Sequence, residues 1–214
     1  MIKLYSYFRS SCSYRVRIAL NLKGLDYEIL PVHLVKDGGE QFKPEFQEIN
    51  PQSRVPVLLD DSFELFQSMA IIEYLDEKHQ RPSLFPGTAQ ERAHIRKLCE
   101  IINADVQPLQ NLRVLTHLVD ELGASEEQKL QWIRTWIGQG FASYEAVLQE
   151  TAGKFSFGDQ PTAADCFLIP QIYNALRFDM DLDSYPLISK VYNHCKSIEA
   201  FEKAHPGNQP DTPA

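Results

Sequence analysis

The stretch that decides the fold is Tyr5-Ser6-Tyr7-Phe8-Arg9-Ser10-Ser11-Cys12-Ser13-Tyr14-Arg15-Val16-Arg17-Ile18-Ala19-Leu20. Its apolar start predicts a strand, and a short polar turn with several hydroxyl groups and one thiol follows. Val16, Ala19 and Leu20 then recur at helical spacing, and Gly24 predicts the end of that helix. The polar turn therefore lies at the first turn of a helix. Unpaired backbone N–H groups and the positive end of the helix dipole stabilise an anion there, a thiolate in particular.

Length and composition predict an ordinary globular protein of one or two domains. The chain has 214 residues, of which 43% are hydrophobic and 23% charged. Its net charge of −8 argues against a nucleic-acid partner, which would require a basic face. No apolar run approaches the roughly 18 residues of a membrane helix, and the start of the chain does not resemble a signal peptide. We therefore expect no membrane partner and a cytoplasmic location.

The cysteines and histidines do not predict a metal site. The four cysteines are far apart, with no C-x-x-C pair, and the six histidines show no spacing typical of metal ligands. Three of the cysteines, Cys99, Cys166 and Cys195, lie in helix-like runs and are expected to be reduced core residues. Cys12 alone lies in the polar turn.

Residues 1–80 alternate between strand and helix patterns. We expect strands at 2–7, 27–32, 57–59 and 63–66, helices at 12–23 and from Gln67-Ser68 onward, and a short helix within 41–49. The run Asp60-Asp61-Ser62 predicts a hairpin between the last two strands. This order predicts a small thioredoxin-like α/β domain.

Residues 81–87 contain two prolines and a glycine and predict a linker. Residues 88–214 then show helical patterns, so the expected second domain is all-α. Pro108 interrupts an apolar stripe from Ile95 to Leu115 and predicts a kink in one long helix. Ile188 to Cys195 indicate the last helix, and the tail from His205 is expected to be draped or loose.

Two further motifs belong to the first domain. Val55-Pro56 precedes a strand, and in a thioredoxin-like fold this proline is cis, which leaves the backbone of Val55 able to pair with a bound peptide. An ordinary trans-proline is the alternative. Gln67-Ser68 begins a helix directly after a strand, either as a simple N-cap or as a second anion site that holds a carboxylate.

Together these motifs resemble the N-terminal domain of cytosolic glutathione transferases. The run from Ser10 to Leu20 is similar to the signature of the zeta class, although Tyr14 stands where that class usually has Trp. The similarity spans essentially the whole chain, and its further segments are Lys36 to Phe42, Gln107 to Leu112, Phe157 to Asp165 and Gln209 to Pro213.

The resemblance implies glutathione as cofactor and assigns its contacts. Ser10, Ser11 and Cys12 match the active-site turn, where Ser11 would stabilise the thiolate of glutathione. Gln41 would contact the glycyl end, and Val55 would pair its backbone with the cysteinyl part, with Pro56 fixing that geometry. The family's remaining glutathione contacts match Gln67 and Ser68, for the γ-glutamyl group, and Asn111 in the second domain.

Three arginines are candidates for binding an acidic substrate. Arg9 adjoins the polar turn, Arg113 follows Pro108, and Arg177 ends a helix. The resemblance places Arg9 and Arg177 at carboxylate-binding positions, and guanidinium groups bind carboxylates bidentately. We expect all three to point into one cleft between the domains. Arg15 and Arg17, on the first helix, are instead expected to be solvated.

The activity that the resemblance implies is glutathione-dependent cis–trans isomerisation of a small acidic enedione. The substrate of choice is 4-maleylacetoacetate, converted to 4-fumarylacetoacetate in tyrosine and phenylalanine catabolism by thiolate addition, rotation and elimination. Arg113 matches an arginine of the maleylpyruvate isomerase branch, so isomerisation of maleylpyruvate in gentisate breakdown is an alternative. A thiol transferase that uses Cys12 and a non-catalytic binding protein are two others.

The family also implies glutathione transferase activity toward small haloacids and a homodimer. Leu65-Phe66 and the long kinked helix are candidate dimer surfaces, but burial in the core explains them equally well.

Overall fold

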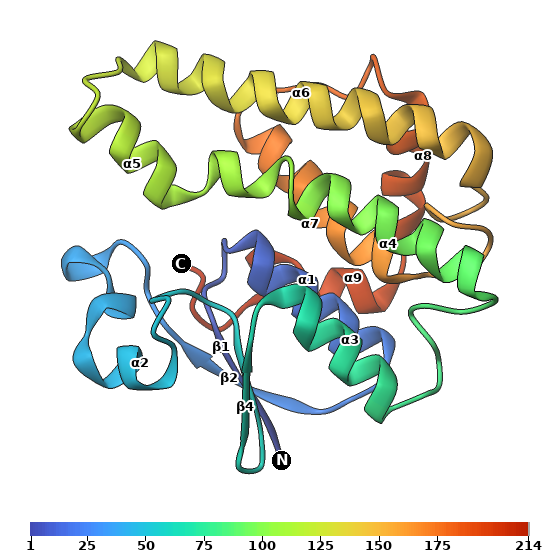
Figure 1. The fold of residues 1–214 in the computed structure, drawn as a ribbon, viewed down its shortest axis with the longest axis horizontal. Helices are drawn as coiled ribbons and strands as arrows, with labels where there is room; N and C mark the ends of the chain where they lie inside the picture. Colours follow the sequence, from blue (N-terminus) through green and yellow to red (C-terminus); the bar gives the residue numbers. More distant parts are fainter. Residues whose placement is uncertain (214) are drawn as a thin grey trace. The chain divides into compact units, whose positions relative to one another are not determined.

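The four predicted strands near the start of the chain are present, and they pair in one mixed sheet. The computed structural model describes residues 1–213 (Figure 1). Strand β1 pairs in parallel with β2 and antiparallel with β3, which pairs antiparallel with β4, in the order β2-β1-β3-β4. The strands are β1 (Ile2–Ser6), β2 (Tyr27–Pro31), β3 (Val57–Asp60) and β4 (Phe63–Phe66).

Helices complete this first unit. Helix α1 (Ser11–Leu22) packs against α3 (Ser68–Lys78), and Figure 1 shows both on the same side of the sheet. The segment expected to hold a short helix contains the 3₁₀ turn η2 (Glu40–Phe42) and helix α2 (Pro44–Ile49), after a first 3₁₀ turn η1 (Lys36–Gly38). The apolar face of α1 is fully buried, since Val16, Ile18 and Leu20 have no exposed surface.

The strand register gathers four connecting segments at one end of the sheet. Tyr5, at the end of β1, lies opposite Val57, at the start of β3, and Val57 lies opposite Phe66, at the end of β4. On the other side, Ser6 lies opposite Pro31, the last residue of β2. The segments that follow β1, β2 and β4, and the one that precedes β3, therefore meet at this end.

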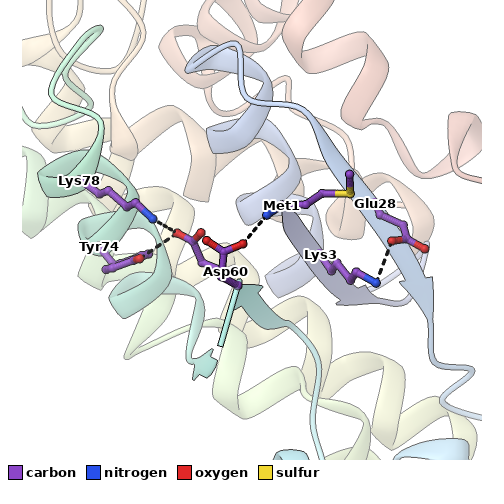
Figure 2. Close-up of polar contacts among 7 residues, drawn as sticks. Met1, Lys3, Glu28, Asp60, Tyr74 and Lys78 are labelled. Carbon is purple, nitrogen blue, oxygen red and sulfur yellow. Dashed lines mark hydrogen bonds and ion pairs between the residues drawn. The ribbon is translucent and has the colours of Figure 1, made fainter. Parts of the chain in front are cut away.

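The opposite end of the sheet is closed by polar pairs (Figure 2). Lys78 and Tyr74, both from α3, donate hydrogen bonds to the carboxylate of Asp60. The bond from Lys78, together with that from Tyr74, holds the pKa of Asp60 below its usual value. Lys3 and Glu28 form a cross-strand ion pair at 3.3 Å. These contacts join β1 to β2 and β3 to α3 at the end of the sheet opposite the predicted site.

The second unit spans Phe85–Cys195 and is helical, as expected. Thr88 and Ser125 form capping boxes that begin α4 and α6, and Glu145 of α6 accepts hydrogen bonds from the first N–H groups of α8. Its elements are α4 (Ala89–Asn103), η3 (Gln107–Gln110), α5 (Leu112–Asp120), α6 (Glu126–Thr151), α7 (Ala163–Arg177) and α8 (Pro186–Cys195).

The expectation of one long helix kinked at Pro108 is wrong. Helix α4 ends at Asn103, Pro108 lies in the 3₁₀ turn η3, and α5 begins afresh after an Asn111 cap. Pro108 has no N–H with which to continue the helical hydrogen bonds. In the same segment, Val106 lies so close to Gly140 of α6 that no Cβ at Gly140 would fit without a shift. The chain between α4 and η3 thus packs against α6 at Val106.

The end of the chain also departs from expectation. The structure adds helix α9 (Glu199–Ala204) and the 3₁₀ turn η4 (Pro206–Asn208) after the predicted last helix. The chain from Lys196 onward groups with Met1–Leu84, so it belongs to the first unit and not to the helical one. Of the two expectations for the tail, the draped one is correct and the loose one is wrong, because the side chain of Asp211 accepts a hydrogen bond from Phe8 N–H at 2.8 Å. The tail thus contacts the segment that follows β1.

The remaining cysteines behave as core residues. Cys99, Cys166 and Cys195 are free and buried, as predicted, and burial raises the pKa of the Cys195 thiol. Among residues 1–213, no cluster of three or more His, Cys, Asp or Glu side chains has the arrangement of a metal site. No helix within the same range combines the length and apolarity that a bilayer crossing requires.

Candidate glutathione site

The predicted polar turn lies at the N-terminus of α1, directly after a buried strand. Ser10 caps the helix: its Oγ accepts a hydrogen bond from Ser13 N–H at 3.2 Å. Ser11 is buried, and Cys12 is a partly exposed free thiol. Within residues 1–213, the backbone N–H groups of Ser11 and Cys12 have no hydrogen-bond partner. This turn therefore presents hydroxyl, thiol and N–H donors to an anion.

The segment before β3 supplies backbone groups. The Val55–Pro56 peptide bond is cis, as predicted. In the described part of the chain, neither the N–H nor the C=O of Val55 forms a hydrogen bond. The Val55 side chain belongs to the same buried cluster as Tyr7 and Phe8, so this backbone lies close to the segment that follows β1. It is able to pair with an extended peptide.

The start of α3 carries the next predicted pair. Gln67 has a φ of 76°, a left-handed conformation that non-glycine residues rarely adopt. Its amide donates to Gln52 Oε1 at 2.6 Å, from the segment just before Val55. Ser68 is buried at the first position of α3, and its hydroxyl accepts a hydrogen bond from Arg15 at 3.1 Å. The hydroxyl proton of Ser68 is thus able to point toward a ligand carboxylate.

Gln41 comes from η2, in the connection that follows β2. Its Nε2 donates to Leu34 O at 3.2 Å, while its Oε1 is buried and, among residues 1–213, has no hydrogen-bond partner. An unsatisfied buried acceptor costs free energy unless a ligand or water donates to it. The residues of the first unit therefore fit a ligand with several peptide-like groups and an anionic end.

The expectation that Arg15 and Arg17 are solvated is wrong. Both side chains are fully buried. Arg17 donates to the backbone oxygens of Tyr7, Phe8 and Ala204 and to Ser6 Oγ, and its guanidinium lies over the Tyr14 ring. Burial is tolerated because carbonyl and hydroxyl oxygens accept from the guanidinium in place of water.

The three candidate substrate arginines occupy more open positions. Arg9 is half-buried, and its guanidinium donates to the hydroxyl of Tyr7 at 3.1 Å. In the helical unit, Arg113 and Arg177 are exposed, on α5 and at the end of α7. Asn111 caps α5 through a bond from Arg113 N–H. The substrate-binding and cofactor-binding roles of these residues stay predictions.

Two residues of this end of the sheet were not predicted. The hydroxyl of Tyr7 accepts from Arg9, and Asp211 accepts from Phe8 N–H. Tyr7 belongs to the quoted decisive stretch, and Asp211 belongs to the terminal run from Gln209 to Pro213. The Tyr7–Arg9 contact is local but has no recognisable sequence pattern. The Asp211–Phe8 contact joins residues 203 positions apart, so it depends on how the end of the chain returns to the first unit.

Comparison with known proteins assigns the family. Residues 1–77 match the glutathione S-transferase N-terminal domain, and residues 113–203 match the C-terminal domain. The chain is 49% identical over 211 residues to maleylacetoacetate isomerase of Mus musculus, across 99% of this chain and 95% of the relative.

Solved structures agree. One is the holo structure of a bacterial zeta-class maleylpyruvate isomerase, with a TM-score of 0.94, 46% identity, and coverage of 99% of this chain and 100% of that one. Another is maleylacetoacetate isomerase of Anaeromyxobacter dehalogenans with bound dicarboxyethyl glutathione and citrate, with a TM-score of 0.88 and 42% identity across 100% and 94%. The chain therefore belongs to the zeta class of the glutathione S-transferase family.

Proposed function

We propose that the protein is a glutathione-dependent cis–trans isomerase that converts 4-maleylacetoacetate to 4-fumarylacetoacetate. The observation that carries the proposal is the start of α1, where Ser10, Ser11 and Cys12 surround backbone N–H groups without a partner in residues 1–213. Full-length similarity to maleylacetoacetate isomerase of Mus musculus supports the reaction. We place the reaction in tyrosine and phenylalanine catabolism.

The first unit fits glutathione as cofactor. Val55 offers unbonded backbone groups for the cysteinyl part, and Gln41 offers a buried unsatisfied oxygen for the glycyl end. Gln67 and Ser68 lie at the start of α3, which suits the γ-glutamyl carboxylate. Asn111 is the proposed contribution of the helical unit. The ligand in the Anaeromyxobacter dehalogenans relative is itself a glutathione derivative.

Glutathione, when bound, supplies a thiolate that adds reversibly to the conjugated cis double bond, so that rotation about the resulting single bond precedes elimination. The residues of this chain favour the ionised sulfur. A free thiol has a pKa of about 8.5, so only a small fraction is ionised at neutral pH. The Ser11 hydroxyl and the N-terminal end of α1 stabilise the negative charge, and one preorganised donor contributes roughly 2–4 kcal/mol.

Arginines are the proposed carboxylate ligands of the substrate. Arg9 lies one residue before the Ser10 cap, and Tyr7 holds its guanidinium from one side. Arg113 and Arg177 are exposed, so a substrate carboxylate can reach them without displacing a buried partner. Planar guanidinium groups bind carboxylates through two parallel hydrogen bonds. A small substrate with two acidic ends suits such a set.

Maleylpyruvate is the second candidate substrate. The resemblance of Arg113 to an arginine of the maleylpyruvate isomerase branch favours it, and a solved zeta-class relative with a TM-score of 0.94 bears that activity by name. Steady-state kinetics with both substrates separate the two. We expect the larger kcat/KM with maleylacetoacetate, and a clear preference for maleylpyruvate would replace our first choice while leaving the chemistry unchanged.

Replacing Ser11 by Ala tests the proposed site. We expect kcat/KM to fall roughly 30- to 1000-fold, because the thiolate loses a preorganised donor. The pKa of bound glutathione, measured from the ultraviolet absorbance of its thiolate, should rise toward its solution value. Ser62→Ala, in the exposed hairpin turn, serves as the control that changes neither quantity. Unchanged turnover and unchanged titration in Ser11→Ala would remove the proposed mechanism.

A thiol transferase reaction through Cys12 is separable from isomerisation. The Cys12 thiol is free and partly exposed at the start of α1. As a thiolate it can attack a disulfide between glutathione and another thiol, take the glutathionyl group and release the other thiol. Cys12→Ala should abolish reduction of a mixed disulfide and leave isomerisation largely intact. Loss of both activities would instead assign Cys12 to the isomerase mechanism.

We further propose a cytoplasmic homodimer with some transferase activity toward small haloacids. Phe66 packs against the buried cluster of the first unit, so core packing accounts for this residue of the pair Leu65-Phe66. Phe63, on the same edge strand, is 46% exposed and is the better contact residue. Sedimentation of the parent and of Phe63→Glu measures the mass. A monomeric parent would refute the dimer.

A further inference from the structure

The segment between β1 and α1 is held at Phe8 from two directions. The N–H of Phe8 donates to Asp211 Oδ2 at 2.8 Å, although the two residues are 203 positions apart. The C=O of Phe8 accepts from the Arg17 guanidinium at 3.0 Å. Both peptide units that flank Phe8 are thereby fixed, immediately before Arg9 and Ser10. The course of this segment therefore depends on the contacts of Phe8 with Asp211 and Arg17, in addition to the capping of α1.

Arg17 extends the same set of contacts to the end of the chain. Its Nε donates to Ala204 O at 3.0 Å, and another nitrogen donates to Ser6 Oγ at 3.0 Å. One fully buried guanidinium thus joins α9 to the strand end and to the segment that follows it. Lysine has no rigid fork and does not reproduce these contacts.

The tail that carries Asp211 is itself anchored. Gln209 donates through its side chain to the backbone oxygens of Lys203 and His205, and Thr212 donates to Pro206 O. Asn21 of α1 donates to Ala200 O at 2.9 Å. Asp211 is therefore presented from a folded segment. Its second oxygen, Oδ1, is buried and accepts no hydrogen bond from residues 1–213.

We propose that Asp211 and Arg17 are positioning residues for the proposed active-site turn. The carboxylate of Asp211 makes a charge-assisted bond to Phe8 N–H, and Arg17 fixes the neighbouring carbonyls. Together they set the direction in which Ser10, Ser11 and Arg9 leave the strand. The role in catalysis rests on the proposed function, because a displacement of about 1 Å at a reacting centre costs up to roughly 100-fold in rate.

Three variants and one control test the role of Asp211. Asp211→Ala and Asp211→Leu remove the acceptor, and the second retains side-chain volume in case the first fails to fold. Asp211→Asn keeps an amide oxygen that accepts the same N–H. Glu202→Ala removes an exposed carboxylate from the neighbouring helix α9 and is the matched control.

Amide hydrogen exchange at Phe8, measured without ligand, is the first readout. We expect exchange to become about tenfold faster or more in Asp211→Ala and Asp211→Leu, with recovery in Asp211→Asn and no change in the control. Unchanged exchange in both acceptor-free variants would overturn the proposal, whatever the activity.

Isomerase kinetics are the second readout. We expect kcat to fall about tenfold in the acceptor-free variants and to recover in Asp211→Asn, while the unfolding midpoint stays near that of the parent. Faster exchange with unchanged kcat would overturn the positioning role. A parent without isomerase activity would refute the proposed function instead, and the exchange result would still decide whether Asp211 holds this segment.

Discussion

The arginines of helix α1 and those of the helical unit have the same side chain in opposite environments. Arg15 and Arg17 have no exposed surface, and their guanidinium groups donate to oxygens of the first unit. Arg113 and Arg177 are exposed. Arg177 donates to Asn174 and lies against the rings of Tyr173 and Phe178.

The difference separates two uses of a guanidinium. A buried arginine with several oxygen acceptors holds backbone segments in place, because removing it leaves those acceptors unsatisfied. Substituting an exposed arginine changes the stability of the protein little, but the arginine itself is able to bind an incoming carboxylate. We therefore expect substitution of the α1 arginines to change the free energy of unfolding, and substitution of the arginines in the helical unit to change ligand affinity.

The largest effect is expected for Arg17→Met. Four oxygens lose a donor, so the free energy of unfolding should fall by about 3 kcal/mol or more. Urea denaturation measures the change. Arg92→Met, at an exposed position of α4, is the matched control and should stay within about 0.5 kcal/mol of the parent. An Arg17 variant as stable as this control would erase the contrast between the two groups of arginines.

Substitutions of the exposed arginines should act on the substrate and not on stability. We expect Arg113→Ala and Arg177→Ala each to lower kcat/KM by roughly 10- to 100-fold through a higher KM, with an unchanged urea midpoint. Arg113→Lys retains the charge but loses the bidentate geometry, and should recover only part of the affinity. Steady-state kinetics with maleylacetoacetate and maleylpyruvate measure these effects. Normal KM in both alanine variants would show that their exposure does not serve substrate binding.

Most of the first unit was predictable because its signals are local. Strand alternation, the hairpin turn and the Gly24 stop follow from short-range periodicity, and the strand and helix bounds differ from the predictions by only a few residues. Helix α9 was missed because it is only Glu199–Ala204, which is too short for a clear apolar stripe. Pro108 predicted an interruption, but the sequence did not show that the helix already ends at Asn103 and that Val106 packs against the distant Gly140.

The residues of the candidate site likewise divide into those that local sequence signals predicted and those that they did not. The hydroxyl and thiol run at the start of α1 and the cis bond before Pro56 were predictable, since each depends on a few neighbouring residues and a fold pattern. The burial of Arg17 and the contact of Asp211 with Phe8 were not, because arginine and aspartate are usually surface residues. Their acceptors and donors come from segments that only the tertiary fold brings together.

The smallest expected effect concerns His205, next to the Ala204 carbonyl that Arg17 binds. Burial, and then the positive charge of Arg17, lowers the pKa of His205 below its usual value of 6.5. Its Nδ1 accepts a hydrogen bond from Gly207 N–H, which requires the unprotonated nitrogen. Between the lowered pKa and 6.5, the unfolded chain binds more protons than the folded one. The stabilisation is therefore complete above pH 6.5 and is lost as the pH falls through this window.

Urea denaturation at pH 7.5 and pH 5.5 measures this loss in the parent and in His205→Asn, whose Oδ1 keeps an acceptor that does not titrate. We expect the parent to lose more stability than the variant, by less than about 1 kcal/mol, because His205 is only partly desolvated and much of its side chain remains in contact with solvent. His94→Asn, at an exposed position of α4, should follow the parent. Equal losses in the parent and in His205→Asn would show that neither burial nor the charge of Arg17 shifts the titration of His205 in the folded protein. Buried Arg17 would then differ from the exposed arginines only in its hydrogen bonds.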